Sequence, residues 1–179
     1  MPDSLRNLAT DELLVARLTR HEDGTGATLV LEHPLTEPTA VAWQWITDPE
    51  LLAQWSPIVP DRPLTGTGAA TARETPDAEP NDAEVLLADA PNELVHRWGP
   101  TTVRWMLTAS DAGTILAIEQ KLGPDELDQA AMMAAGWHLC FAVLTARLDG
   151  RDIPRVVGHE SVNYGWNELN DRYERAFHR

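Results

Sequence analysis

The sequence predicts an α+β domain in which an antiparallel sheet packs around one long helix near the C-terminus. Three observations favour this fold class. Segments with period-two alternation follow one another closely over residues 83–120, as in an antiparallel meander. After Gly123-Pro124 the apolar residues change to the three- and four-residue steps of a helix. Two short helices within residues 36–55 present apolar faces to a large partner.

The first expected element is a β-hairpin. Residues 13–20 and 27–35 flank a turn sequence at residues 21–26, which contains two glycines. A helix over residues 11–20 is the alternative. Alternation in the second strand places four apolar side chains on one face, which should meet the core: Ala27, Leu29, Leu31 and Leu35.

Two helix starts follow in succession. Thr36 can cap the first helix, and the early Pro38 costs that helix no hydrogen bond. Thr47 and Glu50 can form a capping box for the second helix, so the two helices meet at Asp48. The spacing predicts one buried face on each helix, formed by Val41, Ala42, Trp45 and Ile46 and by Leu51, Leu52 and Trp55.

The next segment, residues 56–82, is interrupted by prolines and should form only weak edge strands. Strands are then expected at residues 83–89, 93–99, 102–108 and 113–120. Alternation and an even-length turn at Gly99-Pro100 place two sets of side chains on one sheet face. These are Leu94, His96 and Trp98 in one strand and Val103, Trp105 and Leu107 in the next.

The long helix carries one apolar stripe, formed by Met133, Trp137, Cys140, Phe141, Leu144 and Leu148. Gly136 within this helix should cost about 1 kcal/mol relative to alanine. Close approach of its backbone to a strand or to a bound molecule would explain the glycine.

A terminal helix is expected after Ile153-Pro154, with Ser161 as its cap. Its apolar stripe consists of Val162, Trp166, Leu169, Tyr173 and Phe177. The stripe can pack on the domain or form the seam of a homodimer, and the sequence does not choose between them.

Several segments resemble the SRPBCC (START/Bet v 1-like) superfamily, and within it the family related to the activator of the Hsp90 ATPase. The resemblance is carried by TDPELLAQW at 47–55, ELVHRWG at 93–99, TVRWMLT at 102–108, GTILAIE at 113–119 and AAGWHLCFAVLTARLDG at 134–150. It implies the helix-grip fold, in which a curved sheet surrounds the long helix. Residues 66–82 depart from the family pattern by being small, polar and acidic.

Length and composition fit one domain over residues 1–179. Within it we expect an N-terminal hairpin segment (1–26), a family core (27–150) and a C-terminal helical extension (151–179). No apolar stretch approaches the length of a membrane span and no leader opens the chain, so we expect a cytoplasmic protein without membrane association. The single cysteine, Cys140, fits a reducing compartment. The net charge of −14, with one lysine, argues against nucleic-acid binding.

No phosphate-binding loop, H-E-x-x-H helix or G-x-S-x-G elbow is present, so we predict no cofactor, metal site or catalytic residue. Enzymatic activity stays open. Cys140 lies on the apolar stripe of the long helix and faces away from His138, which favours a buried hydrophobe over a nucleophile. His96 shares the inward face of its strand with Trp98. It can orient a ligand, although a core imidazole with backbone or hydroxyl partners is the favoured interpretation.

The seven tryptophans favour a wide interior, and apolar cavities with few polar groups bind small molecules. The first hypothesis is therefore a module that binds a lipophilic or aromatic small molecule between the sheet and the long helix. Its expected lining is Trp55, His96, Trp98, Trp105, Met133, Trp137 and Phe141. The resemblance implies two alternatives: a co-chaperone-like protein that docks on the Hsp90 ATPase, and an enzyme like the superfamily's cyclases and hydrolases.

Overall fold

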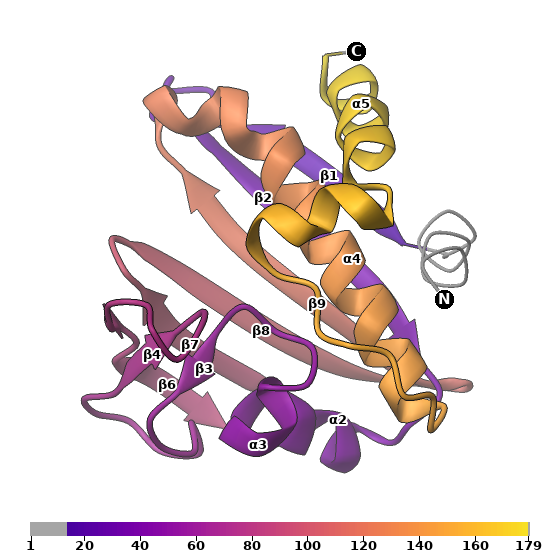
Figure 1. Cartoon of the computed structure of the whole chain (residues 1–179). Coiled ribbons are helices and arrows are strands. Elements are labelled where there is room, and N and C mark those ends of the chain that lie inside the picture. The colour runs from indigo at the N-terminus through magenta and orange to yellow at the C-terminus, as the bar shows by residue number, and fades with distance from the viewer. Residues whose placement is uncertain (1–13, 179) are drawn as a thin grey trace.

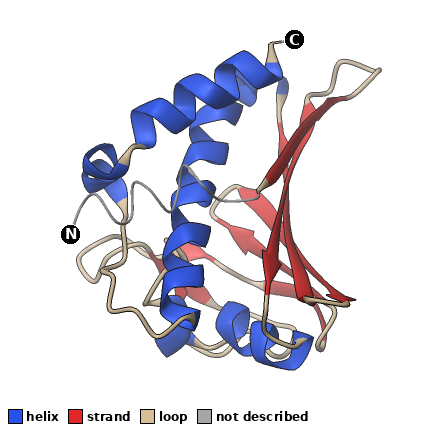
Figure 2. Cartoon of the chain, turned by 90° about the vertical axis from the view of Figure 1, so that its right-hand side faces the viewer, coloured by secondary structure: helices blue, strands red, loops and turns tan. Residues whose placement is uncertain are grey.

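A six-stranded antiparallel sheet and one long helix dominate the computed structural model, which describes residues 14–178. The sheet order is β1-β2-β9-β8-β7-β6. Its strands are β1 (Val15–Arg20), β2 (Ala27–Leu35), β6 (Val85–Asp89), β7 (Glu93–Trp98), β8 (Thr101–Ser110) and β9 (Gly113–Leu122). Helix α4 (Ala130–Leu148) lies along the concave face of the curved sheet (Figures 1 and 2). The predicted α+β class is confirmed.

The N-terminal hairpin is confirmed as well. Strand β1 pairs with β2 from Val15↔Glu32 to Arg20↔Ala27. The helical alternative is therefore wrong for residues 15–20, while residues 11–13 lie outside the described part of the chain. The predicted apolar face of β2 is buried, and the same face also buries His33, which is 1% exposed.

The two short helices, α2 (Thr39–Thr47) and α3 (Pro49–Leu52), meet at Asp48 as predicted, but both predicted caps are wrong. Pro38 occupies the N-cap position of α2 without a side-chain hydrogen bond. For α3 the cap is Asp48, whose carboxylate accepts from the Glu50 N–H at 2.8 Å. Thr47 instead donates its hydroxyl hydrogen to the Trp43 carbonyl inside α2 (2.7 Å).

The buried face of α2 also differs from the prediction at two positions. Ala42 and Ile46 are buried as expected, but Trp43 is buried where Val41 and Trp45 were expected. Helix α2 starts at Thr39, two residues later than a Thr36 cap would place its first residue. The carbonyl of Trp45 accepts from the indole N–H of Trp55 at 3.1 Å and so links the two helices.

Residues 56–82 form short strands, as expected, but not as edges of the large sheet. Strands β3 (Val59–Pro60), β4 (Thr71–Arg73) and β5 (Asn81–Asp82) make a separate three-stranded sheet. A single bridge, Gly68↔Val85, joins this segment to β6. Pro60 and the glycines of this segment explain why no strand exceeds three residues.

The meander has the predicted register. Leu94 pairs with Trp105 and His96 with Val103, and all four side chains are buried. On the opposite face Arg104 forms ion pairs with the carboxylates of Glu93 (2.6 Å) and Glu119 (3.7 Å).

Four aromatic rings fill the centre of the interface between the sheet and α4. Trp55 and Trp105 meet edge to face with ring centroids 6.0 Å apart, and Phe141 stacks on Trp55, also at 6.0 Å. Trp137 meets the edge of Trp105 at 5.4 Å and 88°. Such offset and perpendicular pairs stabilise a core beyond their buried area, so this region is packed protein and not a void.

The C-terminal segment returns over α4 through the 3₁₀ helix η2 (Gly158–Tyr164) and ends in α5 (Trp166–Phe177). Ser161 is not the cap of α5. It lies inside η2 and donates to the Gly158 carbonyl, while Gly165 occupies the cap position with φ of 92°. Leu169 and Tyr173 of α5 are buried against α4, so this part of the expected stripe packs on the domain (Figure 1). Val162 lies in η2 and is 44% exposed, so its place in the stripe is wrong.

The segment Pro124–Leu148, which joins the 3₁₀ helix η1 (Pro124–Gln129) to α4, is long and apolar enough to cross a membrane by length and composition alone. The sequence-based statement that no stretch reaches this length is therefore corrected. In the fold, 67% of its most apolar window is buried inside the protein, as in the core helix of a globular domain.

Candidate ligand-binding cleft

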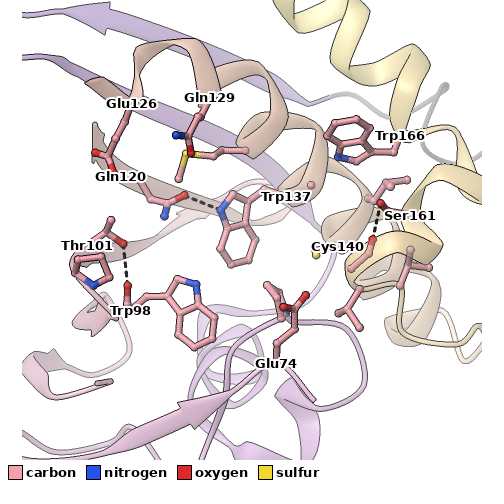
Figure 3. A pocket seen from close by; sticks show the side chains of 18 residues that line it. Glu74, Trp98, Thr101, Gln120, Glu126, Gln129, Trp137, Cys140, Ser161 and Trp166 are labelled. Atoms are coloured by element: carbon pink, nitrogen blue, oxygen red, sulfur yellow. Dashed lines mark hydrogen bonds between the residues drawn. The ribbon is translucent and has the colours of Figure 1, made fainter. Parts of the chain in front are cut away.

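A cleft of about 460 Å³ opens where α4 passes the β7–β8 turn (Figure 3). The turn contributes Trp98, Pro100 and Thr101 to its wall, and β9 contributes Gln120. The wall on α4 is formed by Met133, Gly136, Trp137, Leu139 and Cys140. The returning C-terminal segment closes the far side with residues 156–158, Ser161 and Trp166.

Trp137 marks the boundary between the packed aromatic core and the cleft. On the core side the Trp137 ring contacts Trp105 and Phe141. On the other side it lines the cleft. Gly136, the preceding residue, contributes no side chain. A β-carbon placed on Gly136 would meet no atom within 4 Å, so the expected close approach to a strand is wrong. The glycine instead widens the cleft.

The deepest polar group of the cleft is the side-chain amide of Gln120, which is 3% exposed. Its oxygen accepts from the Trp137 indole N–H at 2.7 Å. Because an indole only donates, this bond fixes which end of the amide carries the oxygen. The amide nitrogen therefore points the other way, toward Trp98 and Thr101 in Figure 3.

The charged groups of the cleft are carboxylates. Glu74 and Glu126 line it, and one oxygen of Glu126 accepts from the Gly123 N–H at 2.8 Å. Among the described lining residues there is no lysine or arginine. Arg155 lies in a neighbouring hollow that shares Glu74, and it donates to the Ser56 carbonyl at 3.0 Å.

The seven residues predicted to line a ligand site divide into two groups. Trp98, Met133 and Trp137 lie in the wall of the cleft. Trp55, Trp105 and Phe141 lie behind Trp137 in the packed aromatic core.

His96 also lies in the core, 1% exposed. One of its ring nitrogens is 2.7 Å from the Arg97 carbonyl, and the other accepts from the Trp105 indole N–H at 3.0 Å. Both nitrogens are therefore engaged by the protein, as the core-imidazole interpretation requires.

Sequence reasoning missed Gln120, Glu74, Glu126 and Trp166. For Gln120 a signal was available, because alternation along β9 places it on the same face as Leu116, Ile118 and Leu122. A polar residue in an inward series of apolar ones is a candidate ligand contact. For Glu74 and Trp166 the sequence held no such signal. Their positions at the cleft depend on how the irregular segments before or around them run, and no periodic pattern predicts that path.

The chemistry of the cleft favours binding over nucleophilic catalysis. Burial raises the pKa of the Cys140 thiol to about 12, so the thiolate that a nucleophile needs does not form near neutral pH. Within residues 14–178, no three His, Cys, Asp or Glu side chains come together to hold a metal ion.

Comparison with solved structures supports the fold. EF2215 from Enterococcus faecalis, a conserved protein of unknown function, superposes with a TM-score of 0.71 at 14% identity over 96% of this chain and 93% of its own. CalU16 from Micromonospora echinospora gives 0.69 at 16% identity over 94% of this chain and 100% of its own. MLL2253 from Mesorhizobium loti gives 0.59 at 24% identity over 70% and 99%.

The curated proteins contain no match to this chain. The sequence profile of the family described as "Activator of Hsp90 ATPase homolog 1-like protein" matches residues 36–149. This span contains α2, α3, the meander and α4, which are the elements that carry the fold and one wall of the cleft. The chain therefore belongs to this family, and its architecture is the helix-grip fold of the SRPBCC superfamily.

Proposed function

We propose that the protein binds a lipophilic, aromatic small molecule in the cleft between α4, the β7–β8 turn and the C-terminal segment. One observation carries the proposal: the interior is packed around Trp55, yet beside Trp137 a hollow of about 460 Å³ is left open. This volume lies in the range of small-molecule sites, and the three indoles of the wall, Trp98, Trp137 and Trp166, supply the apolar surface that such sites use.

The family supports ligand binding in general, since the SRPBCC fold is shared by ligand-binding domains. Trp98 and Trp137 offer flat apolar surfaces on which an aromatic ring can stack, and Met133 can adapt to irregular shapes. The proposed site therefore lies outside the aromatic core, and not within it as the sequence suggested. Its wall keeps Trp98, Met133 and Trp137, while the remaining four residues support these from behind.

The test uses N-phenyl-1-naphthylamine, a neutral apolar fluorophore whose emission rises in an apolar site. We expect saturable binding and a matching rise in melting temperature, as linkage requires of a ligand that binds only the folded state. Replacement of Trp98 by alanine should weaken binding about tenfold, which corresponds to the loss of roughly 1.4 kcal/mol of contact energy.

The matched control is Trp45→Ala, because Trp45 is also partly buried but lies in α2, away from the cleft. It should leave the affinity unchanged. Equal weakening by both variants, or emission that never saturates, would contradict the proposal.

Docking on a chaperone ATPase is the second candidate, and one surface feature favours it. Leu86 and Leu87 are adjacent on the edge strand β6 and are 43% and 41% exposed. Exposed apolar residues on an edge strand can bind a partner. An Hsp90 ATPase assay with added protein separates the candidates, because only the docking function changes the ATPase rate and responds to Leu87→Glu.

A further inference from the structure

The amide nitrogen of Gln120 is a donor that faces the cleft and makes no hydrogen bond with the described residues. Gln120 occupies the middle of the sheet, paired with Leu29 of β2 and Val103 of β8, and is 3% exposed. The bond from the Trp137 indole commits its oxygen, and within residues 14–178 its nitrogen makes no hydrogen bond. A donor that faces a cleft and has no acceptor in the protein is available to an acceptor on a bound ligand.

The partner must carry an acceptor at the position that the amide faces. The nitrogen points to the space between Trp98, Thr101 and Trp137 (Figure 3). The hydroxyl of Thr101 donates to the Trp98 carbonyl at 3.1 Å, so its hydrogen is committed. A ligand ring between the two indoles would place a substituent on that ring within reach of the Gln120 amide.

The charge of the cleft decides which acceptors are allowed. Glu74 and Glu126 line the walls, no lysine or arginine does so among the described residues, and the whole chain carries a net charge of −14. A carboxylate bound here would lose its hydration and would face Glu126, while the nearest basic residue, Arg155, already interacts with Glu74. A carbonyl or ether oxygen accepts the same hydrogen bond without that cost.

We propose that the ligand is an uncharged aromatic compound whose carbonyl or ether oxygen accepts a hydrogen bond from the Gln120 amide, and that carboxylates are rejected. This inference rests on the proposed binding function and specifies its ligand class. It treats Gln120 as a specificity-determining residue, with Trp137 as the residue that orients it.

Three naphthalenes of nearly equal shape test the inference by displacement of N-phenyl-1-naphthylamine. They are 2-acetylnaphthalene, 2-isopropylnaphthalene and 2-naphthoate, which differ in carrying a carbonyl, no acceptor or a carboxylate. We expect the ketone to bind roughly three- to tenfold more tightly than the hydrocarbon, the range of one net hydrogen bond. The carboxylate should bind more weakly than the ketone by at least that factor.

The variant Gln120→Glu, measured at pH 8, keeps an oxygen for the Trp137 indole and removes the amide donor. It should abolish the preference for the ketone over the hydrocarbon. Gln54→Glu makes the same change on a side chain next to α3 that lies outside the cleft, and it should leave the preference intact. If Gln120→Glu does not fold, Gln120→Leu combined with Trp137→Phe removes both the amide and the indole donor, and it should likewise abolish the preference.

A double variant tests the role of the two carboxylates. Glu74→Gln combined with Glu126→Gln should bring the affinity for 2-naphthoate closer to that for the ketone, whereas Glu79→Gln, an exposed residue outside the cleft, should not.

The outcomes separate the two proposals. Equal binding of ketone and hydrocarbon, or tighter binding of the carboxylate, overturns the inference and leaves the binding function standing. The inference also falls if the fluorophore binds and none of the three compounds displaces it. If the fluorophore itself does not bind, the proposed function fails and this inference fails with it.

Discussion

His33 shows how a single buried side chain can make the stability of the protein depend on pH. It is 1% exposed, stacks on Phe141 with ring centroids 5.2 Å apart, and lies 2.8 Å from the Thr145 hydroxyl. Burial, with a smaller contribution from the neighbouring His138, lowers its pKa from 6.5 to about 4. Burial also lowers the pKa of His96. The folded protein therefore disfavours protonation at both sites.

The first prediction follows from the sign of the His33 shift. The unfolded chain binds a proton near pH 6.5 and the folded protein only near pH 4, so stability is complete above 6.5 and falls as the pH drops toward 4. Between pH 7.5 and 4.5, urea unfolding should show a loss on the order of 2–3 kcal/mol from His33 alone. His33→Phe should lack this part of the loss, and the exposed His159→Gln should keep it. Identical pH profiles for His33→Phe and the unchanged protein would contradict the assignment.

A second prediction concerns two glycines that differ in their surroundings. Because a β-carbon at Gly136 meets open space inside a helix, Gly136→Ala should stabilise the fold by about 1 kcal/mol. Gly26 has φ of 133°, and its β-carbon would lie 1.9 Å from the Leu122 carbonyl oxygen, so Gly26→Ala should destabilise it. Thermal unfolding of both variants measures the difference. A melting temperature lowered by Gly136→Ala would mean that the wall of the cleft is closed at this point.

At the scale of elements, hydrophobic periodicity predicted the long, regular strands and helices. Strands β7, β8 and β9 are long enough to show alternation, so the sequence alone could place Leu94 and Trp105 on one face. The segment of residues 56–82 has strands of two or three residues, too short to show a period. Periodicity also did not show that Trp43 is more deeply buried than Trp45, and the cap signals at Thr36 and Thr47 are not used in the structure.

The cap of α3 gives the third prediction. Asp48 accepts from the Glu50 N–H, and it should hold the junction of α2 and α3 through its carboxylate. Asp48→Ala should therefore cost about 1 kcal/mol in urea unfolding, while Asp48→Asn, which keeps an acceptor, should cost little. Glu50→Gln should be nearly neutral, since its side chain takes no part in the cap. If Glu50→Gln cost as much as Asp48→Ala, a capping box would be operating in solution.

For the whole molecule, the predicted layers are right, but the location of the cleft could not be predicted. Strand alternation correctly turned Trp105 toward the interior, and helical periodicity did the same for Phe141. Whether an inward ring fills the core or lines a hollow depends on how the volumes match across two layers, which no local pattern reports. The cleft also needs residues 156–166 to return over α4, a path set by irregular chain. Three of the seven expected residues consequently form the wall and four form its support.

The final prediction concerns α5 and the assembly of the chain. Leu169 and Tyr173 are 2% and 5% exposed, and the Tyr173 hydroxyl lies 2.7 Å from a ring nitrogen of His138 in α4. A stripe used within one chain is not available to a second copy, so α5 should stabilise the monomer. Leu169→Ala should cost about 2–5 kcal/mol, as expected for a truncated core leucine, whereas the exposed Asn167→Ala should cost little. Sedimentation should show the same mass for both variants, and the unfolding midpoint should not change with protein concentration. A midpoint that rises with concentration, together with dissociation caused by Leu169→Ala, would instead identify α5 as the seam of a homodimer.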